Sequence, residues 1–221
     1  MLSHKLRTAA AAAGGSYTPP SVVSSSYLKM ATGNSITAPT GISSGNLLLA
    51  FWWNNAPNGN ISFTSVPSGF TSIYSKGDTV TLQLYVKIAT GSEPSSYTWS
   101  FTGATNHYQL LVNLTGNSLV GSSDGSGTPV SNTTNSFTFL AKGGFTTTHP
   151  GIVFAHCIDK ENSAFPLSST GVTDIRNQMD GTVGQYLGYI DASTPQTFSD
   201  RTFQRSANST KEHQGLQVHI Y

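Results

Sequence analysis

Charged residues are scarce in this sequence. Asp, Glu, Lys and Arg together make up 10% of its 221 residues, whereas they make up about 25% of a typical soluble domain. The formal net charge is +1 and the isoelectric point is near 7.9. A chain with this balance sets up no strong field of either sign, so we expect no nucleic-acid partner.

Cysteine and long apolar runs are also nearly absent. Cys157 is the sole cysteine, which excludes an intrachain disulfide framework and a zinc site built from several cysteines. It stands in the apolar run IVFAHCI, so we interpret it as a buried core thiol rather than a nucleophile. No run of about 18 apolar residues occurs, so we expect no insertion into a membrane.

The sequence also lacks long stretches with the helical spacing of Ala, Leu, Glu and Lys. Short apolar segments instead alternate with turn clusters from Ser21 onward, as is typical of antiparallel strands. The chain is therefore predicted to be all-β. The segments are 22–30, 47–53, 61–66, 80–88, 97–101, 108–114, 137–140, 152–158, 186–190, 197–203 and 216–221.

One stretch, residues 85–101, shows the pattern most clearly. Its sequence YVKIATGSEPSSYTWSF reads as strand, turn and strand, with Glu93 in the turn. Tyr97, Trp99 and Phe101 are two residues apart, so in an extended chain their side chains lie on one face and require a common core.

The stretch has an apparent counterpart later in the chain. LLLAFWWNN (47–55) parallels IVFAHCIDK (152–160) at an offset of 105 residues, and Tyr85 parallels Tyr186 at an offset of 101. Leu110 parallels Leu216 at an offset of 106. We predict a single antiparallel, jelly-roll-like β-sandwich (21–221) built from two similar halves, about 21–120 and 130–221. The alternative is chance similarity between strands of equal periodicity.

Residues 1–20 are predicted to form an extended N-terminal arm and linker outside the sandwich. The basic start MLSHKLR is followed by alanines, which are too weakly hydrophobic for a signal peptide, and then by Gly and Pro pairs. We expect the arm to bind a neighbouring subunit through the side chains of its first residues. These are Leu2, His4, Lys5, Leu6 and Arg7.

Three groups of residues match catalytic or metal-binding patterns only superficially. Gly-x-Ser-x-Gly occurs twice, at 41–45 around Ser43 and at 121–125 around Ser123, but no helix pattern follows either site, as a nucleophile elbow requires. His156, Asp159 and Glu161 are close in sequence, but a strand at 152–158 would make His156 a half-buried core residue and 159–162 a turn. Asp174 and Asp180 have no fixed geometry for acid-base work. We expect no catalytic residue, no metal and no cofactor.

Two adjacent tryptophans form the best candidate for a binding surface. Trp52 and Trp53 must point to opposite faces of a strand, so one of them can reach the surface beside Asn54 and Asn55. Inter-sheet packing or contact with a neighbouring subunit is the favoured interpretation. Stacking on a glycan, with the amides as hydrogen-bonding groups, is the alternative.

Several motifs resemble those of bacteriophage virion structural proteins with a β-sandwich module, a family that includes tail-fibre, minor structural and decoration proteins. They are GNLLLA at 45–50, the turn PSGF at 67–70, and YVKIA at 85–89 leading to EPSSYTW at 93–99. The resemblance spans roughly residues 40–115 and implies a non-enzymatic component of the virion. The chain differs from the fibre-type members in having no repetitive shaft.

From these observations we expect a virion protein that decorates or cements a particle. Its partners would be other capsid or tail proteins and further copies of itself in a homo-oligomer, for example a trimer. The alternative is a tail-associated module that recognises a cell-surface glycan on the host through Trp52 or Trp53. A secreted hydrolase acting through Ser43 or Ser123 is a third and remote interpretation.

Overall fold

The computed structural model describes residues 19–30, 34–54, 62–77, 81–102, 107–115, 138–141, 145–147, 149–159, 170–180, 183–199, 201–204 and 213–221. Over these residues the chain forms seventeen strands and no helix, so the predicted all-β class is confirmed. Nothing in this described part of the chain is a helix that could span a membrane.

Nine strands belong to two antiparallel sheets, which are the largest in the structure. The five-stranded sheet has the order β1-β9-β3-β6-β5, and the four-stranded sheet has the order β13-β14-β12-β17. Their bounds are β1 Ser21–Met30, β3 Leu47–Asn54, β5 Thr71–Gly77, β6 Thr81–Ile88, β9 His107–Thr115, β12 Gly151–Asp159, β13 Thr173–Asp180, β14 Val183–Ala192 and β17 His213–Ile220.

The other eight strands form four short antiparallel pairs. The pairs are β2 with β7, β4 with β8, β10 with β16 and β11 with β15. Their bounds are β2 Ser35–Thr37, β4 Ser62–Ser65, β7 Ser96–Thr98, β8 Ser100–Thr102, β10 Thr138–Ala141, β11 Phe145–Thr146, β15 Thr197–Phe198 and β16 Arg201–Gln204.

The two large sheets follow the same plan. In the N-terminal half the order β9-β3-β6-β5 places strands in the same sequence as β17-β12-β14-β13 does in the C-terminal half. A β-bulge also recurs at the same place. Ile73 bulges out of β5 between Ser72 and Tyr74, and Ile175 bulges out of β13 between Asp174 and Arg176. Because a bulge shifts the register of a strand by one residue, the two bulges change the pairing of β5 with β6 and of β13 with β14 in the same way.

The registers agree with two of the three sequence offsets and correct the third. Ala50 lies opposite Leu111 and Tyr85, and Ala155 lies opposite Gln217 and Gly188. Gly188, and not Tyr186, therefore occupies the position of Tyr85. The structure offers a reason why the sequence comparison paired Tyr85 with Tyr186. The Tyr186 hydroxyl lies 2.6 Å from the point where a Gly188 Cβ would stand, so this side chain reaches the position that corresponds to Tyr85. A tyrosine two residues away covers the space above the glycine.

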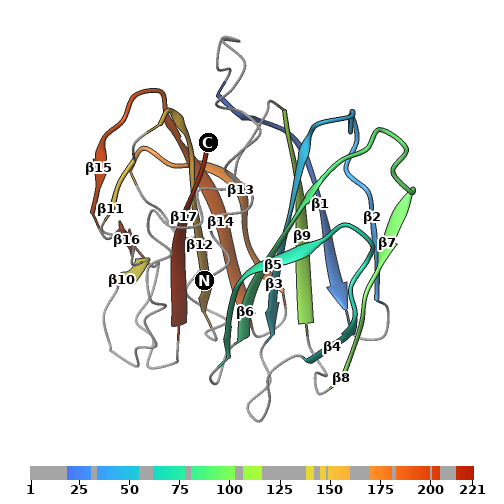
Figure 1. Cartoon of the computed structure of the whole chain (residues 1–221). Coiled ribbons are helices and arrows are strands. Elements are labelled where there is room, and N and C mark those ends of the chain that lie inside the picture. The colour runs from blue at the N-terminus through green and yellow to red at the C-terminus, as the bar shows by residue number, and fades with distance from the viewer. Residues whose placement is uncertain are drawn as a thin grey trace.

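The large sheets pack against each other face to face, with the short pairs on their outer sides (Figure 1). We call the apolar cluster between the large sheets the central core; it includes Phe51, Trp53, Leu110, Phe154 and Leu187. A second cluster, the N-terminal outer core, lies on the other face of the five-stranded sheet and includes Leu48, Trp52, Tyr97 and Trp99. A third, the C-terminal outer core, consists of Val153, Ala192, Phe198 and the partly buried Ile190. β3 and β12 are thus covered on both faces.

Candidate functional site

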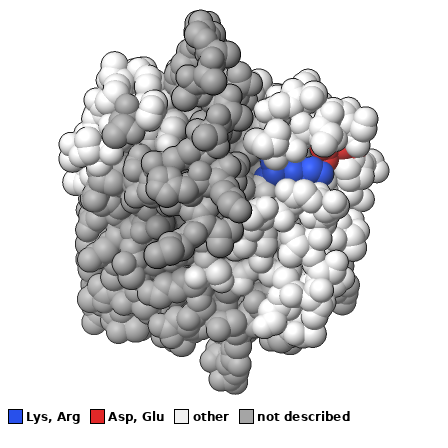
Figure 2. Space-filling model, in the orientation of Figure 1, with Lys and Arg blue, Asp and Glu red and all other residues white. Residues whose placement is uncertain are grey.

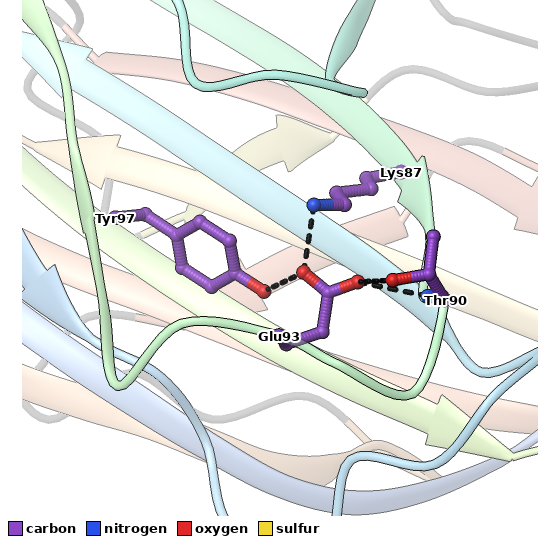
Figure 3. A network of polar contacts seen from close by, with 4 residues as sticks. All are labelled: Lys87, Thr90, Glu93 and Tyr97. Atoms are coloured by element: carbon purple, nitrogen blue, oxygen red, sulfur yellow. Dashed lines mark hydrogen bonds and ion pairs between the residues drawn. The ribbon is translucent and has the colours of Figure 1, made fainter.

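The most elaborate polar group in the described residues is centred on Glu93, in the turn between β6 and β7 (Figure 3). Lys87 near the end of β6 places its Nζ 2.6 Å from Glu93 Oε2. The Tyr97 hydroxyl donates to the same oxygen at 2.7 Å, while the Thr90 backbone N–H donates to Oε1 at 2.8 Å. The Thr90 hydroxyl also donates to Oε1, at 3.2 Å.

Aromatic rings enclose the cation of this group. Lys87 Nζ lies 5.3 Å from the centre of the Tyr97 ring and 5.8 Å from that of Phe70. Phe70 comes from the PSGF turn, in which Gly69 has a φ of +88° and faces the Lys87 stem so closely that an added Cβ would lie 3.0 Å from its Cε. The side chains of Lys87 and Glu93 are 11% and 5% exposed. The pair is therefore largely withdrawn from solvent, which strengthens its attraction.

Burial by itself would raise the pKa of Glu93. The hydrogen bond from Lys87, those from Thr90 and Tyr97 and the charge of Lys87 outweigh it, and the pKa falls to about 2. Burial and the adjacent carboxylate raise the pKa of Tyr97. Near neutral pH the Glu93 carboxyl is therefore ionised and the Tyr97 hydroxyl is protonated. Fixed protonation states suit a structural role in holding the turn better than proton transfer.

The C-terminal half builds the corresponding turn without charge. Tyr97 pairs with Ile36 as Phe198 pairs with Phe145. Lys87 lies opposite Leu48 as Ile190 lies opposite Val153. Apolar side chains of the C-terminal outer core therefore replace the lysine and the phenol.

On the face drawn in Figure 2, charge in the described part is confined to a short basic band beside an acidic patch.

The structure buries the two tryptophans that were proposed as a glycan platform. Trp52 is 0% and Trp53 is 1% exposed. Trp52 packs edge-on against Trp99 at 5.2 Å in the N-terminal outer core, and Trp53 stacks on Tyr108 at 5.9 Å in the central core. The expectation that one of them reaches the surface is wrong, because β3 is covered on both faces. Asn54 is also buried, and Asn55 lies outside the described residues.

Gln109 is a residue that sequence reasoning missed. With its amide oriented to satisfy its neighbours, its oxygen accepts hydrogen bonds from the indole N–H groups of Trp99 at 2.9 Å and Trp52 at 3.2 Å. Gln109 is 0% exposed. A glutamine in the middle of an apolar strand, in a chain whose tryptophans need acceptors, is the signal that could have identified it.

The structure describes only some members of the suspected metal-binding and acidic groups. His156 is 1% exposed and faces Phe51 and Trp53, whereas Asp159 ends β12 and Glu161 lies outside the described residues. Among the described residues no group of three His, Cys, Asp or Glu side chains could hold a metal ion. Asp174 instead accepts hydrogen bonds from Tyr186 at 2.6 Å and Asn177 at 3.0 Å.

The other candidate residues lie in the core, in a turn or outside the described residues. Cys157 is buried, as predicted. Ser43 lies in the turn before β3, where its carbonyl accepts from the Asn46 N–H at 3.1 Å, so a strand and not a helix follows it. Ser123 lies outside the described residues, and so do the arm residues Leu2, His4, Lys5, Leu6 and Arg7.

Comparison with known proteins gives no relative. No protein-family model matches the chain, and no curated protein or solved structure resembles it at a significant level. The assignment of a function therefore rests on the residues and the geometry described above.

Proposed function

We propose that this chain is a non-enzymatic virion structural protein that decorates or cements a phage particle. Its body would be one jelly-roll-like β-sandwich made of two similar halves. The central core supports this view of the body, because it draws side chains from both large sheets. Binding energy, rather than chemistry, would be its contribution to the particle.

The position of β1 is the observation that carries the proposal. The chain leaves residues 1–20 and enters β1, which is an edge strand paired on one side with β9. An edge strand offers backbone N–H and C=O groups to another chain. Val23, the bulged residue of β1, is 41% exposed and adds apolar surface to this edge. An arm that leads into such a strand is well placed to reach a neighbouring subunit.

The proposed mechanism is ordering of the arm upon docking. Leu2 and Leu6 would add apolar area to the contact, and His4, Lys5 and Arg7 would form hydrogen bonds with a neighbouring virion protein. Repeated copies on a symmetric particle, or within a homo-oligomer such as a trimer, would multiply the weak individual contacts through avidity. Capsid and tail proteins are the partners this role requires.

Deletion of residues 2–18 tests the proposal. We expect purified particles to lose this protein, while the far-UV circular dichroism and the thermal unfolding of the isolated variant stay as in the full chain. A matched variant, Leu2→Ser with Leu6→Ser, keeps the arm length and should reduce the copy number per particle. Particles with the normal copy number after deletion would overturn the proposal.

The glycan-binding alternative is not favoured by the geometry. It depended on an exposed ring at Trp52 or Trp53, and both are buried. A glycan array separates the two functions, since saturable binding to a saccharide by the full chain would support host recognition instead.

A further inference from the structure

A buried histidine stands in the central core between the two large sheets. His156 on β12 is 1% exposed, and its ring lies 5.0 Å from that of Trp53 and 5.5 Å from that of Phe51 across the sheet interface. Within the described residues neither ring nitrogen has a hydrogen-bond partner. A buried polar group in this condition costs free energy of folding and calls for an explanation.

The internal repeat shows that packing alone does not require a histidine here. Ala50 and Ala155 occupy corresponding positions in the two large sheets, so the residue that follows Ala50, Phe51, corresponds to His156. The N-terminal half therefore places a phenylalanine where the C-terminal half places an imidazole. The two side chains contact each other, which puts the histidine near the middle of the interface between the halves.

Four tyrosines belong to the apolar cluster around His156, namely Tyr27, Tyr74, Tyr108 and Tyr189. The strand neighbour on β14 is Leu187, and Gln185 lies one pair further along the same face. A cation lies near this end of the core, since the Arg176 guanidinium sits 3.2 Å from the centre of the Tyr27 ring, which stacks on Trp53 at 6.4 Å.

Two other titratable residues of the neighbouring strands lie on the outer face, because they alternate with the residues that face His156. They are Tyr186, opposite Cys157 on β14, and His219, opposite Val153 on β17. Burial lowers the pKa of His156 to about 3. A proton on this ring would thus be a buried, uncompensated charge between two apolar sheets.

We propose that His156 makes the interface between the two large sheets sensitive to pH. Acid charges the His156 ring and thereby loosens the packing between the sheets. The inference is independent of the role in a virion. It assigns a use to an imidazole that lacks a hydrogen-bond partner among the described residues and that has a phenylalanine as its counterpart in the other large sheet. Acidification would open the central core before the individual sheets are lost.

The sign of the effect follows from the two protonation states. The pKa of His156 is lower in the folded chain than in the unfolded chain, so its contribution to stability is intact above pH 6.5 and is lost as the pH falls toward 3. At pH 5 this residue alone should raise the unfolding equilibrium constant about 30-fold relative to pH 8.

The test compares the full chain with His156→Phe, which copies the N-terminal half. Urea unfolding between pH 8 and pH 4 gives the stability, and an apolar dye reports exposure of the central core. We expect the full chain to bind dye near pH 3–4, where the His156 ring begins to be charged, while its far-UV circular dichroism persists. His156→Phe should bind no dye there, and between pH 8 and pH 5 its unfolding constant should rise about 30-fold less than that of the full chain.

His107→Phe is the matched control. His107 is buried, and burial lowers its pKa to about 4. Its ring, however, lies 4.1 Å from that of Phe101, which packs against the N-terminal outer core rather than the central core. This variant should retain acid-induced dye binding. Dye binding by His156→Phe equal to that of the full chain would overturn the proposal. If His156→Phe fails to fold, the ring of His156 can be titrated by NMR in the unmodified protein, where a pKa near 6.5 would equally overturn it.

Discussion

Replacement of Glu93 by glutamine would remove the charge of the buried carboxylate and keep the shape of the side chain. Lys87 would then remain 11% exposed against two aromatic rings with no anion beside it. Loss of one partner of a buried ion pair costs about 3–5 kcal/mol, whereas an exposed pair contributes less than about 1 kcal/mol. Because both side chains are nearly covered, we expect Glu93→Gln to lower the free energy of unfolding by about 3 kcal/mol at pH 7.

A double-mutant cycle separates the ion pair from the rest of the turn. Lys87→Ile introduces the residue that the C-terminal half has at Ile190 and should also destabilise the protein, because it leaves Glu93 buried without its cation. The double variant Lys87→Ile with Glu93→Gln leaves no unpaired charge. Its loss should be smaller than the sum of the single losses by roughly 1–3 kcal/mol.

Urea denaturation followed by circular dichroism measures all three values. Asp191→Asn, an exposed carboxylate on β14, is the control and should change stability by less than about 0.5 kcal/mol. The pKa of Glu93 is lower in the folded chain, so its contribution is present above pH 4.5 and is lost as the pH falls to about 2. Glu93→Gln should lack that loss. A cost below about 1 kcal/mol, with additive single effects, would refute our account of the network.

Two further substitutions test the packing around the large sheets, each by urea denaturation. Gln109→Leu removes the acceptor of two buried indole N–H groups and should cost about 2–4 kcal/mol, and a loss under about 1 kcal/mol would contradict the assigned bonds. Gly188→Ala places a Cβ 2.5 Å from Val172 Cγ1 and 2.6 Å from the Tyr186 hydroxyl, and should cost roughly 1–3 kcal/mol. A neutral effect there would show that the ring of Tyr186 does not depend on the glycine.

The sequence was sufficient to predict that the fold is all-β and to predict most of the long strands. Apolar alternation bounded by turns predicted strands at 47–53 and 80–88, and the structure has them at Leu47–Asn54 and Thr81–Ile88. It also predicted Glu93 as a turn residue and Cys157 as buried. These features depend on local patterns, which a single sequence contains.

Features that depend on distant partners could not be predicted in this way. The burial of Trp52 requires a short strand pair that covers the outer face of β3. The unbroken apolar run LLLAFWW is consistent with a strand covered on both faces, but it does not say which residues supply the cover. The ion pair of Glu93 needs Lys87 and Tyr97 to converge across a turn. The register error at Tyr186 arose because a ring can fill the space above a glycine two residues away, which sequence alignment cannot detect.

The shared central core has a consequence for how the molecule opens. Phe51 and Trp53 on one sheet, and Phe154 on the other, lose their cover together if either large sheet departs. At neutral pH, where His156 is uncharged, the halves should therefore form one cooperative unfolding unit in hydrogen exchange, with β3 and β12 among the slowest strands to exchange. The short outer pairs contribute little to that interface, so they can open and close as smaller units while the centre stays intact. Substitutions in the short outer pairs should therefore change the surface of the molecule with little effect on its cooperative unfolding.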